Sequence, residues 1–181
     1  INIDAIKKKV MRGASVPAGL MVAPQINGFN ASLNDRPSYD PTGAKKLLAD
    51  AGYPDGFEVT MDCPNNRYVN DERICQASAS MLAKIGIKVT LLAQPKSKYF
   101  GKVLAQNNYD TSFFLLGWTP STFDSHNPRS SLMACRGGPD KLGAFNLGGY
   151  CNPRINELAA SIQSETNQEK RQNMIDEAFK I

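Results

Sequence analysis

Two short segments of the chain collect the side chains best suited to hold a polar molecule. Residues 63–68 read Cys-Pro-Asn-Asn-Arg-Tyr, and residues 117–124 read Gly-Trp-Thr-Pro-Ser-Thr-Phe-Asp. Together they offer aromatic rings, hydroxyls, an amide, one guanidinium and one carboxylate, a mixture that suits a polar organic ligand. We therefore predict a binding site that uses Asn65, Arg67, Trp118, Thr119, Ser121, Phe123 and Asp124.

Each of these side chains also has a purely structural explanation. Trp118 is the only tryptophan and could anchor the core, while Arg67 could be an ordinary solvated loop residue. Asn65 could simply cap the turn before Tyr68. The residues alone leave these explanations open beside the ligand role.

Asp124, Ser125 and His126 have the residue types of a hydrolase triad, but three consecutive side chains cannot easily converge on one point. The chain also lacks the G-x-S-x-G elbow of many hydrolases. We predict that the chain is not an enzyme. An exported hydrolase that uses Ser121 or Ser125 with His126 is the alternative of another class.

The four cysteines form two groups along the chain, and the single histidine argues against a structural zinc site. No metal or other cofactor is expected. We favour the sequential pairing, Cys63–Cys75 and Cys135–Cys151, because each pair brackets a compact local segment. Four free thiols are the alternative. Disulfides would place the protein outside the cytoplasm.

The elements that must position the two candidate segments alternate between strand and helix. Strands are expected at 57–62, 87–92 and 109–116, with helices between them. This alternation predicts an α/β fold with three parallel strands and helices on both faces of the sheet. Residues 63–68 and 117–124 then leave carboxyl ends of strands at one edge, where ligands of such sheets bind.

The remaining segments complete this single predicted domain of 181 residues. Residues 1–13 read as a helix, and residues 14–38 as an extended connection without a period. Two more helices begin at Asn152 and Asn167. The basic residues are scattered, and Lys7 to Lys9 read as a solvated helix face, so no nucleic-acid partner is expected.

Four blocks, in order, resemble the family 5 extracellular solute-binding proteins, which include dipeptide- and oligopeptide-binding proteins. Residues 39–57 are similar to the family's Y-D-P-x-x-A-x-x-L-L-x-x-A-G-Y-P-x-G-F block. Residues 82–89 resemble its L-x-x-I-G-I-x-V junction, and residues 150–171 its Y-x-N-P…T-D-x-x-K-R ending. Residues 2–17 resemble its opening I-N-R-x-A-I…R-G-x-A-x-P segment.

The resemblance implies that residues 1–181 are a fragment, one lobe of a two-lobe protein with a type II periplasmic-binding-protein-like fold. It implies the solute-binding component of an ABC import system, which closes on a peptide or similar polar organic solute. The full-length protein would deliver this solute to a membrane permease. Its expected location is the periplasm, or another extracytoplasmic site with a membrane tether.

One departure from the family pattern bears on the solute. The family's G-W-x-x-D stretch carries an aspartate that can hold the amino group of a bound peptide, and Ser121 stands at that position here. Asp124 could substitute only if the loop is shaped differently. An oligosaccharide-type or other non-peptide solute is therefore an alternative to a peptide. As a different class of function, the chain could be a free-standing interaction domain.

Overall fold

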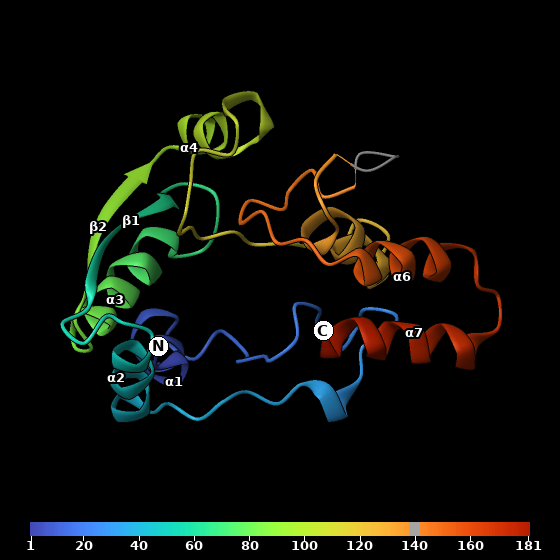
Figure 1. Cartoon of the computed structure of the whole chain (residues 1–181), viewed down its shortest axis with the longest axis horizontal. Helices are drawn as coiled ribbons and strands as arrows, with labels where there is room; N and C mark the ends of the chain where they lie inside the picture. The colour runs from blue at the N-terminus through green and yellow to red at the C-terminus, as the bar shows by residue number, and fades with distance from the viewer. Residues whose placement is uncertain (138–141) are drawn as a thin grey trace. The chain divides into compact units, whose positions relative to one another are not determined.

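A computed structural model describes residues 1–137 and 142–181, and these divide into two compact units (Figure 1). The first unit contains residues 1–17 and 37–117, and the second contains residues 18–36 and 118–181. Residues 14–38 thus contribute to both units, and Val22 and Ile26 in this stretch are buried. The description of residues 1–181 as one domain, with 14–38 as a connection, stays a prediction.

The first unit is built around two parallel strands, β1 (Phe57–Pro64) and β2 (Ile87–Gln94), which Figure 1 shows side by side. Their register runs from Phe57 opposite Ile87 to Pro64 opposite Gln94. Helix α3 (Asp71–Ala83) makes the crossover between them. The predicted α/β fold with parallel pairing of these strands is confirmed.

The third predicted strand, 109–116, is wrong in its extent. These residues form only one parallel bridge, between Phe114 and Asp62, beside β1. The Asp62 amide donates to Phe113 O at 2.8 Å, and the Leu115 amide donates to Asp62 O at 3.1 Å. The segment begins in a turn at Tyr109, whose φ is 54°, and Pro64 has no N–H with which to extend the ladder.

Helices cover both faces of this small sheet, as the alternation predicts. Cys75 of α3 packs with Met61 and Cys63 on one face. Side chains alternate across a strand, so Asp62 points to the other face. There its carboxylate accepts a hydrogen bond at 3.1 Å from Lys102 of α4 (Lys96–Val103).

The beginning of the chain and α2 belong to the same unit. Residues 1–13 are helical in two short pieces, α1 (Ile3–Ala5) and the π-helix Ile6–Val10. Helix α2 (Pro41–Asp50) is capped by Asp40, which accepts a hydrogen bond from the Gly43 amide at 2.8 Å. None of the residues of α2 is buried, and Leu47 is 70% exposed.

The second unit is organised by two long helices, α6 (Pro153–Ser164) and α7 (Gln168–Lys180). Asn152 and Asn167 cap them through their side-chain oxygens, as predicted. Their contact forms the core of this unit, which contains Ile155, Leu158, Ile162, Ile175 and Ala178. Short helical pieces surround this core at Ala31–Leu33, at α5 (His126–Pro128) and at Arg129–Met133, and another lies in the first unit at Ala105–Asn107.

Both predicted disulfides are confirmed. Cys63 bonds to Cys75 within the first unit, and Cys135 bonds to Cys151 within the second. Each unit therefore carries its own covalent link. Among the described residues, no helix is both long and apolar enough to cross a membrane.

Candidate functional site

The segment after β1 and the residue that opens segment 117–124 meet in the first unit. The Tyr68 hydroxyl donates to Gly117 O at 3.1 Å. A Cβ atom on Gly117 would lie 2.8 Å from the Tyr68 ring, so only glycine allows this approach. Within the first unit, the parallel sheet thus brings the loop after β1 and Gly117 to its carboxyl edge, where ligands of such sheets bind.

Asn65 and Arg67 are exposed on the loop that follows β1. The loop is shaped by Asp71, a buried residue whose Oδ2 accepts the Arg67 amide at 2.8 Å and the Tyr68 amide at 2.9 Å. The Arg67 guanidinium lies over the Tyr68 ring, 5.0 Å from its centre. Within the described residues Arg67 forms no ion pair, so its charge is available to an anionic group.

Trp118 lies at the start of the second unit and is half-buried. Its Nε1–H donates to Asn127 Oδ1 at 2.8 Å, and its ring meets Phe145 edge-on with 4.9 Å between centroids. The hydrogen bond and the aromatic contact fix the indole without burying it. Asn127 and Phe145 gave no signal in the sequence, because their role depends only on contacts made after folding.

Three further candidate residues, Thr119, Ser121 and Phe123, are exposed in the same segment. Phe123 is 65% exposed and has a φ of 51°, a conformation that non-glycine residues seldom adopt. Such outliers persist only where their surroundings determine the backbone. Hydrogen bonds of its own backbone, from its amide to Pro120 O at 3.1 Å and from the Asn27 amide to its carbonyl oxygen, hold Phe123 in this conformation.

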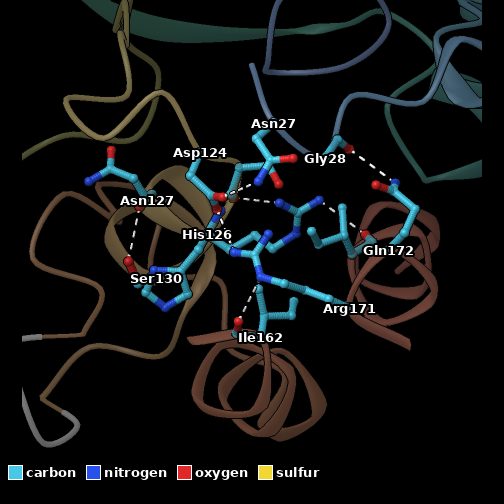
Figure 2. A network of polar contacts seen from close by, with 12 residues as sticks. Asn27, Gly28, Asp124, His126, Asn127, Ser130, Ile162, Arg171 and Gln172 are labelled. Atoms are coloured by element: carbon cyan, nitrogen blue, oxygen red, sulfur yellow. Dashed lines mark hydrogen bonds and ion pairs between the residues drawn. The ribbon is translucent and has the colours of Figure 1, made fainter. Parts of the chain in front are cut away.

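Asp124 is the centre of a polar network in the second unit (Figure 2). Its Oδ1 accepts hydrogen bonds from the His126 amide and from Arg171 Nη2, both at 2.8 Å, and its Oδ2 accepts one from Asn27 Nδ2 at 2.8 Å. Backbone bonds join the same segments, from the Asn27 amide to Phe123 O and from the Ser125 amide to Asn27 O, each at 2.9 Å.

The network also reaches the helical core, because Arg171 of α7 donates through Nε to Ile162 O at 3.0 Å. Three internal donors already satisfy the Asp124 carboxylate, which favours a structural role for it. Its role as a ligand residue stays a prediction. The sequence offered no reason to pair Asp124 with Asn27, since Asn27 lies in a stretch without a period.

The electrostatics of this network keep Asp124 ionised. Burial by itself would raise the pKa of Asp124, but hydrogen bonds from Arg171, the His126 amide and Asn27 outweigh it, and the pKa lies below its ordinary value. Burial lowers the pKa of His126, although the nearby Asp124 charge opposes this shift. Near neutral pH the network therefore contains an anionic Asp124 and a neutral His126.

The hydrolase alternative finds no support in this geometry. The Ser125 hydroxyl is buried and has no hydrogen-bond partner among the described residues, so it is not activated by His126. Asp124 contacts the backbone amide of His126, whereas a triad requires contact with the imidazole ring. Among the described residues, no group of three or more His, Cys, Asp or Glu side chains could hold a metal ion.

Of the seven predicted site residues, Asn65 and Arg67 belong to the first unit and the other five to the second. The structure brings Arg67 close to Gly117 through Tyr68, and it places Thr119, Ser121 and Phe123 in one exposed segment. A common ligand for both groups stays a prediction.

The sequence and fold of this chain are similar to those of known transport proteins. Residues 1–140 match the family model described as bacterial extracellular solute-binding proteins, family 5 Middle. The glutathione-binding protein GsiB of Salmonella choleraesuis (strain SC-B67) is 32% identical over 173 residues, which cover 94% of this chain and 33% of the relative. GsiB of Escherichia coli (strain K12) is 30% identical over 173 residues, with the same coverage.

Two solved structures show the same similarity. The binding protein AgaA from A. tumefaciens R10, in complex with agropinic acid, has a TM-score of 0.80 and 27% identity over 97% of this chain and 35% of its own. A dipeptide-binding protein from Pseudoalteromonas sp. SM9913, in complex with Met-Leu, has a TM-score of 0.80 and 25% identity over 98% and 34%. The chain spans about a third of the length of these relatives.

Proposed function

Because the chain belongs to family 5 of the bacterial extracellular solute-binding proteins, we propose that it is one lobe of the solute-binding component of an ABC import system. The family consists of binding proteins, so the prediction that the chain is not an enzyme is confirmed. In this proposal a second lobe closes over the solute by hinge motion. The full-length protein lies outside the cytoplasm, in the periplasm or tethered to the membrane. There it delivers the solute to a membrane permease.

The observation that carries the proposal is the hydrogen bond from the Tyr68 hydroxyl to Gly117 O, which lies beside the exposed Arg67 at the carboxyl edge of the sheet in the first unit. Trp118 follows Gly117 in the sequence and belongs to the second unit, and its place beside Arg67 in one site is part of the proposal. An exposed guanidinium can bind a carboxylate through two hydrogen bonds, and a fixed indole offers a face for stacking. We infer that the solute carries a carboxylate and a flat or apolar part.

The same site argues against a ligand held by a free amino terminus. Ser121, at the position of the family's aspartate, is exposed and carries no charge. The carboxylate of Asp124 is committed to Arg171, Asn27 and the His126 amide. We therefore propose a peptide or similar polar organic solute that is recognised without its amino group, which leaves room for a non-peptide acid.

Relatives of this chain are named for different solutes, which is consistent with a site that varies between members. GsiB is named for glutathione, and the two solved structures contain agropinic acid and Met-Leu. A sugar-like solute is the second candidate, because Trp118 could stack on a sugar ring while Ser121 bonds to a hydroxyl. Arg67 favours the acidic solute over the neutral sugar.

Replacing Ser121 tests this assignment. The unaltered full-length protein should bind Met-Leu and N-acetyl-Met-Leu with similar affinity, because no carboxylate at position 121 reads the amino group. Ser121→Asp should strengthen binding of Met-Leu about tenfold, since it adds a charge-assisted hydrogen bond to the free amino group. Binding of the acetylated peptide, which lacks that charged group, should not become stronger. Titration calorimetry with both peptides, glutathione and maltotriose measures this difference.

Ser121→Asn is the matched control, because it has the size of aspartate without its charge. It should leave the ratio of the two peptide affinities unchanged. The assignment of position 121 fails if Ser121→Asp alters both peptides equally. Binding of maltotriose alone would favour the sugar, and binding of none of the four solutes by the full-length protein would contradict the proposed solute class.

A further inference from the structure

Pro64 interrupts the hydrogen-bond ladder at the end of β1 that leads to the candidate site. Two residues earlier, the Asp62 amide donates to Phe113 O at 2.8 Å, and Asp62 O accepts from the Leu115 amide at 3.1 Å. In a parallel pair this pattern repeats every two residues. Residue 64 would therefore donate its N–H to Leu115 O, but proline has no N–H.

The bond that is missing belongs to this edge of β1 and not to the other. The Asn65 amide donates to Gln94 O of β2 at 2.9 Å, so residue 65 faces β2. Neighbouring residues of a strand direct their backbone groups to opposite edges. Pro64 therefore faces residues 113–115, and Leu115 O has lost its regular donor.

Tyr99 provides a donor at this position. Its hydroxyl donates to Leu115 O at 2.8 Å, and the side chain is fully buried in α4. Burial raises the pKa of Tyr99 well above its ordinary value, so the hydroxyl keeps its proton and remains a donor. One turn later on the same helix, Lys102 Nζ bonds to Asp62 Oδ2 at 3.1 Å, which fixes α4 over the same stretch of the sheet.

The carbonyl that Tyr99 holds lies just before residues 117–124, the candidate binding loop. Leu115 precedes Gly117 by two residues, and Gly117 O accepts the second tyrosine hydroxyl, that of Tyr68, at 3.1 Å. Two tyrosine hydroxyls thus hold alternate carbonyls of the segment that enters residues 117–124. A regular third strand would have held one of them through its own ladder.

We propose that Tyr99 is a positioning residue for the candidate binding loop, because its hydroxyl replaces the ladder hydrogen bond that Pro64 cannot make to Leu115. The hydrogen bond itself is independent of any ligand. Only the consequence for solute affinity rests on the proposed function.

Amide hydrogen exchange, resolved by residue in the full-length protein, tests the replacement. Tyr99→Phe keeps the ring and removes the donor, so the Leu115 amide should exchange about tenfold faster. Pro64→Ala returns an N–H at the position where the ladder needs it. The double variant Pro64→Ala/Tyr99→Phe should therefore recover the exchange rate of the unaltered protein at Leu115.

Tyr53→Phe is the control, since it removes the hydroxyl of a half-exposed tyrosine in the same unit and should leave the Leu115 rate unchanged. The replacement is contradicted if Tyr99→Phe exchanges like the unaltered protein, or if the double variant exchanges as fast as Tyr99→Phe. Recovery in the double variant cannot arise from a general loss of folding.

Affinity for glutathione and Met-Leu, measured by titration calorimetry on the same variants, tests the positioning role. We expect about tenfold weaker binding for Tyr99→Phe and recovery in the double variant. Faster exchange with unchanged affinity would overturn the positioning role and leave only a structural bond. If neither solute binds the unaltered protein, the proposed solute class fails, while exchange at Leu115 still decides whether Tyr99 orders the entry to the loop.

Discussion

Asp124 connects three segments that are distant in the sequence. Its carboxylate joins Asn27, the His126 amide and Arg171, and only 19% of each side chain in the Asp124–Arg171 pair is exposed. Removing one partner of a pair with so little exposure costs more than removing one from a surface ion pair, because the remaining charge is left with little solvent. This carboxylate therefore supports the conformation of the residues around it, together with the backbone hydrogen bonds between Asn27 and Phe123 and between Ser125 and Asn27.

Asp124→Asn should lower the free energy of unfolding by about 1 to 2 kcal/mol at pH 7, because it removes the charge from these hydrogen bonds. The folded-state pKa of Asp124 is lowered, so its stabilisation is complete above the ordinary aspartate pKa, near 3.9, and is lost as the pH falls through the folded-state value. Urea unfolding at pH 7 and at about pH 2 measures the difference between variant and unaltered protein.

Glu58→Gln is the control for this experiment. It removes an ion pair with Lys88 in which the side chains are 70% and 73% exposed, and such a pair should contribute nothing measurable. A difference between Asp124→Asn and the unaltered protein that persists undiminished at acid pH would show that the charge of Asp124 is not the source of the effect.

Local sequence signals predict residues whose role depends on their immediate neighbours. The cap of α2 at Asp40 and the caps of α6 and α7 follow from side chains that bond to amides two or three residues later. The partners of Asp124 were not predictable in this way, because Asn27 is 97 residues away. The residues next to Asn27 in the sequence do not indicate that contact.

Among the secondary-structure elements, the third predicted strand shows how one residue, Pro64, limits strand pairing. Residues 109–116 have the apolar character of a buried strand, and Phe113 and Leu115 do pack against the core of the first unit. The apolar pattern indicates contact with the core, although both residues are only partly buried. It does not predict the pairing, because Pro64 on the neighbouring strand lacks the donor.

Helix α2 shows that local signals can indicate an element without indicating its burial. The cap at Asp40, the proline of the first turn and the glycine that follows the helix are local signals that favour a helix here. Its apolar residues nevertheless remain outside the buried core, as Leu47 shows. Helix signals are local, whereas burial depends on what other parts of the molecule provide.

The two disulfides should each stabilise only the unit in which they lie. Cys63→Ala/Cys75→Ala should cost about 2 to 4 kcal/mol, because the unfolded chain gains the entropy of an open loop. The loss should appear as faster hydrogen exchange in β1 and α3, with α6 and α7 unchanged. Exchange mass spectrometry on peptides from both units measures this distribution.

The pair Cys135→Ala/Cys151→Ala is the matched counterpart, and its effect should appear in the second unit alone. Equal acceleration of exchange in both units by either pair of substitutions would show that the units unfold together. An absence of any change would show that the disulfides do not contribute to stability.

At the level of the whole protein, we propose that this chain is one lobe of a two-lobe binding protein. The chain covers about a third of its curated relatives and matches the middle region of the family model. The resemblance seen in four sequence blocks predicted this family, since those blocks are local motifs. The solute was not predictable from these blocks, because in the proposed two-lobe protein it would also contact side chains of the second lobe.

The affinity of the isolated 181-residue chain for its solute, compared with that of the full-length protein, tests whether two lobes enclose the solute. A solute enclosed by two lobes loses about half of its contacts when one lobe is absent. A loss of about 4 kcal/mol would turn a micromolar site into a near-millimolar one. Titration calorimetry should therefore find near-millimolar binding, or none, for the folded isolated chain. Micromolar binding by the isolated chain would contradict the two-lobe mechanism.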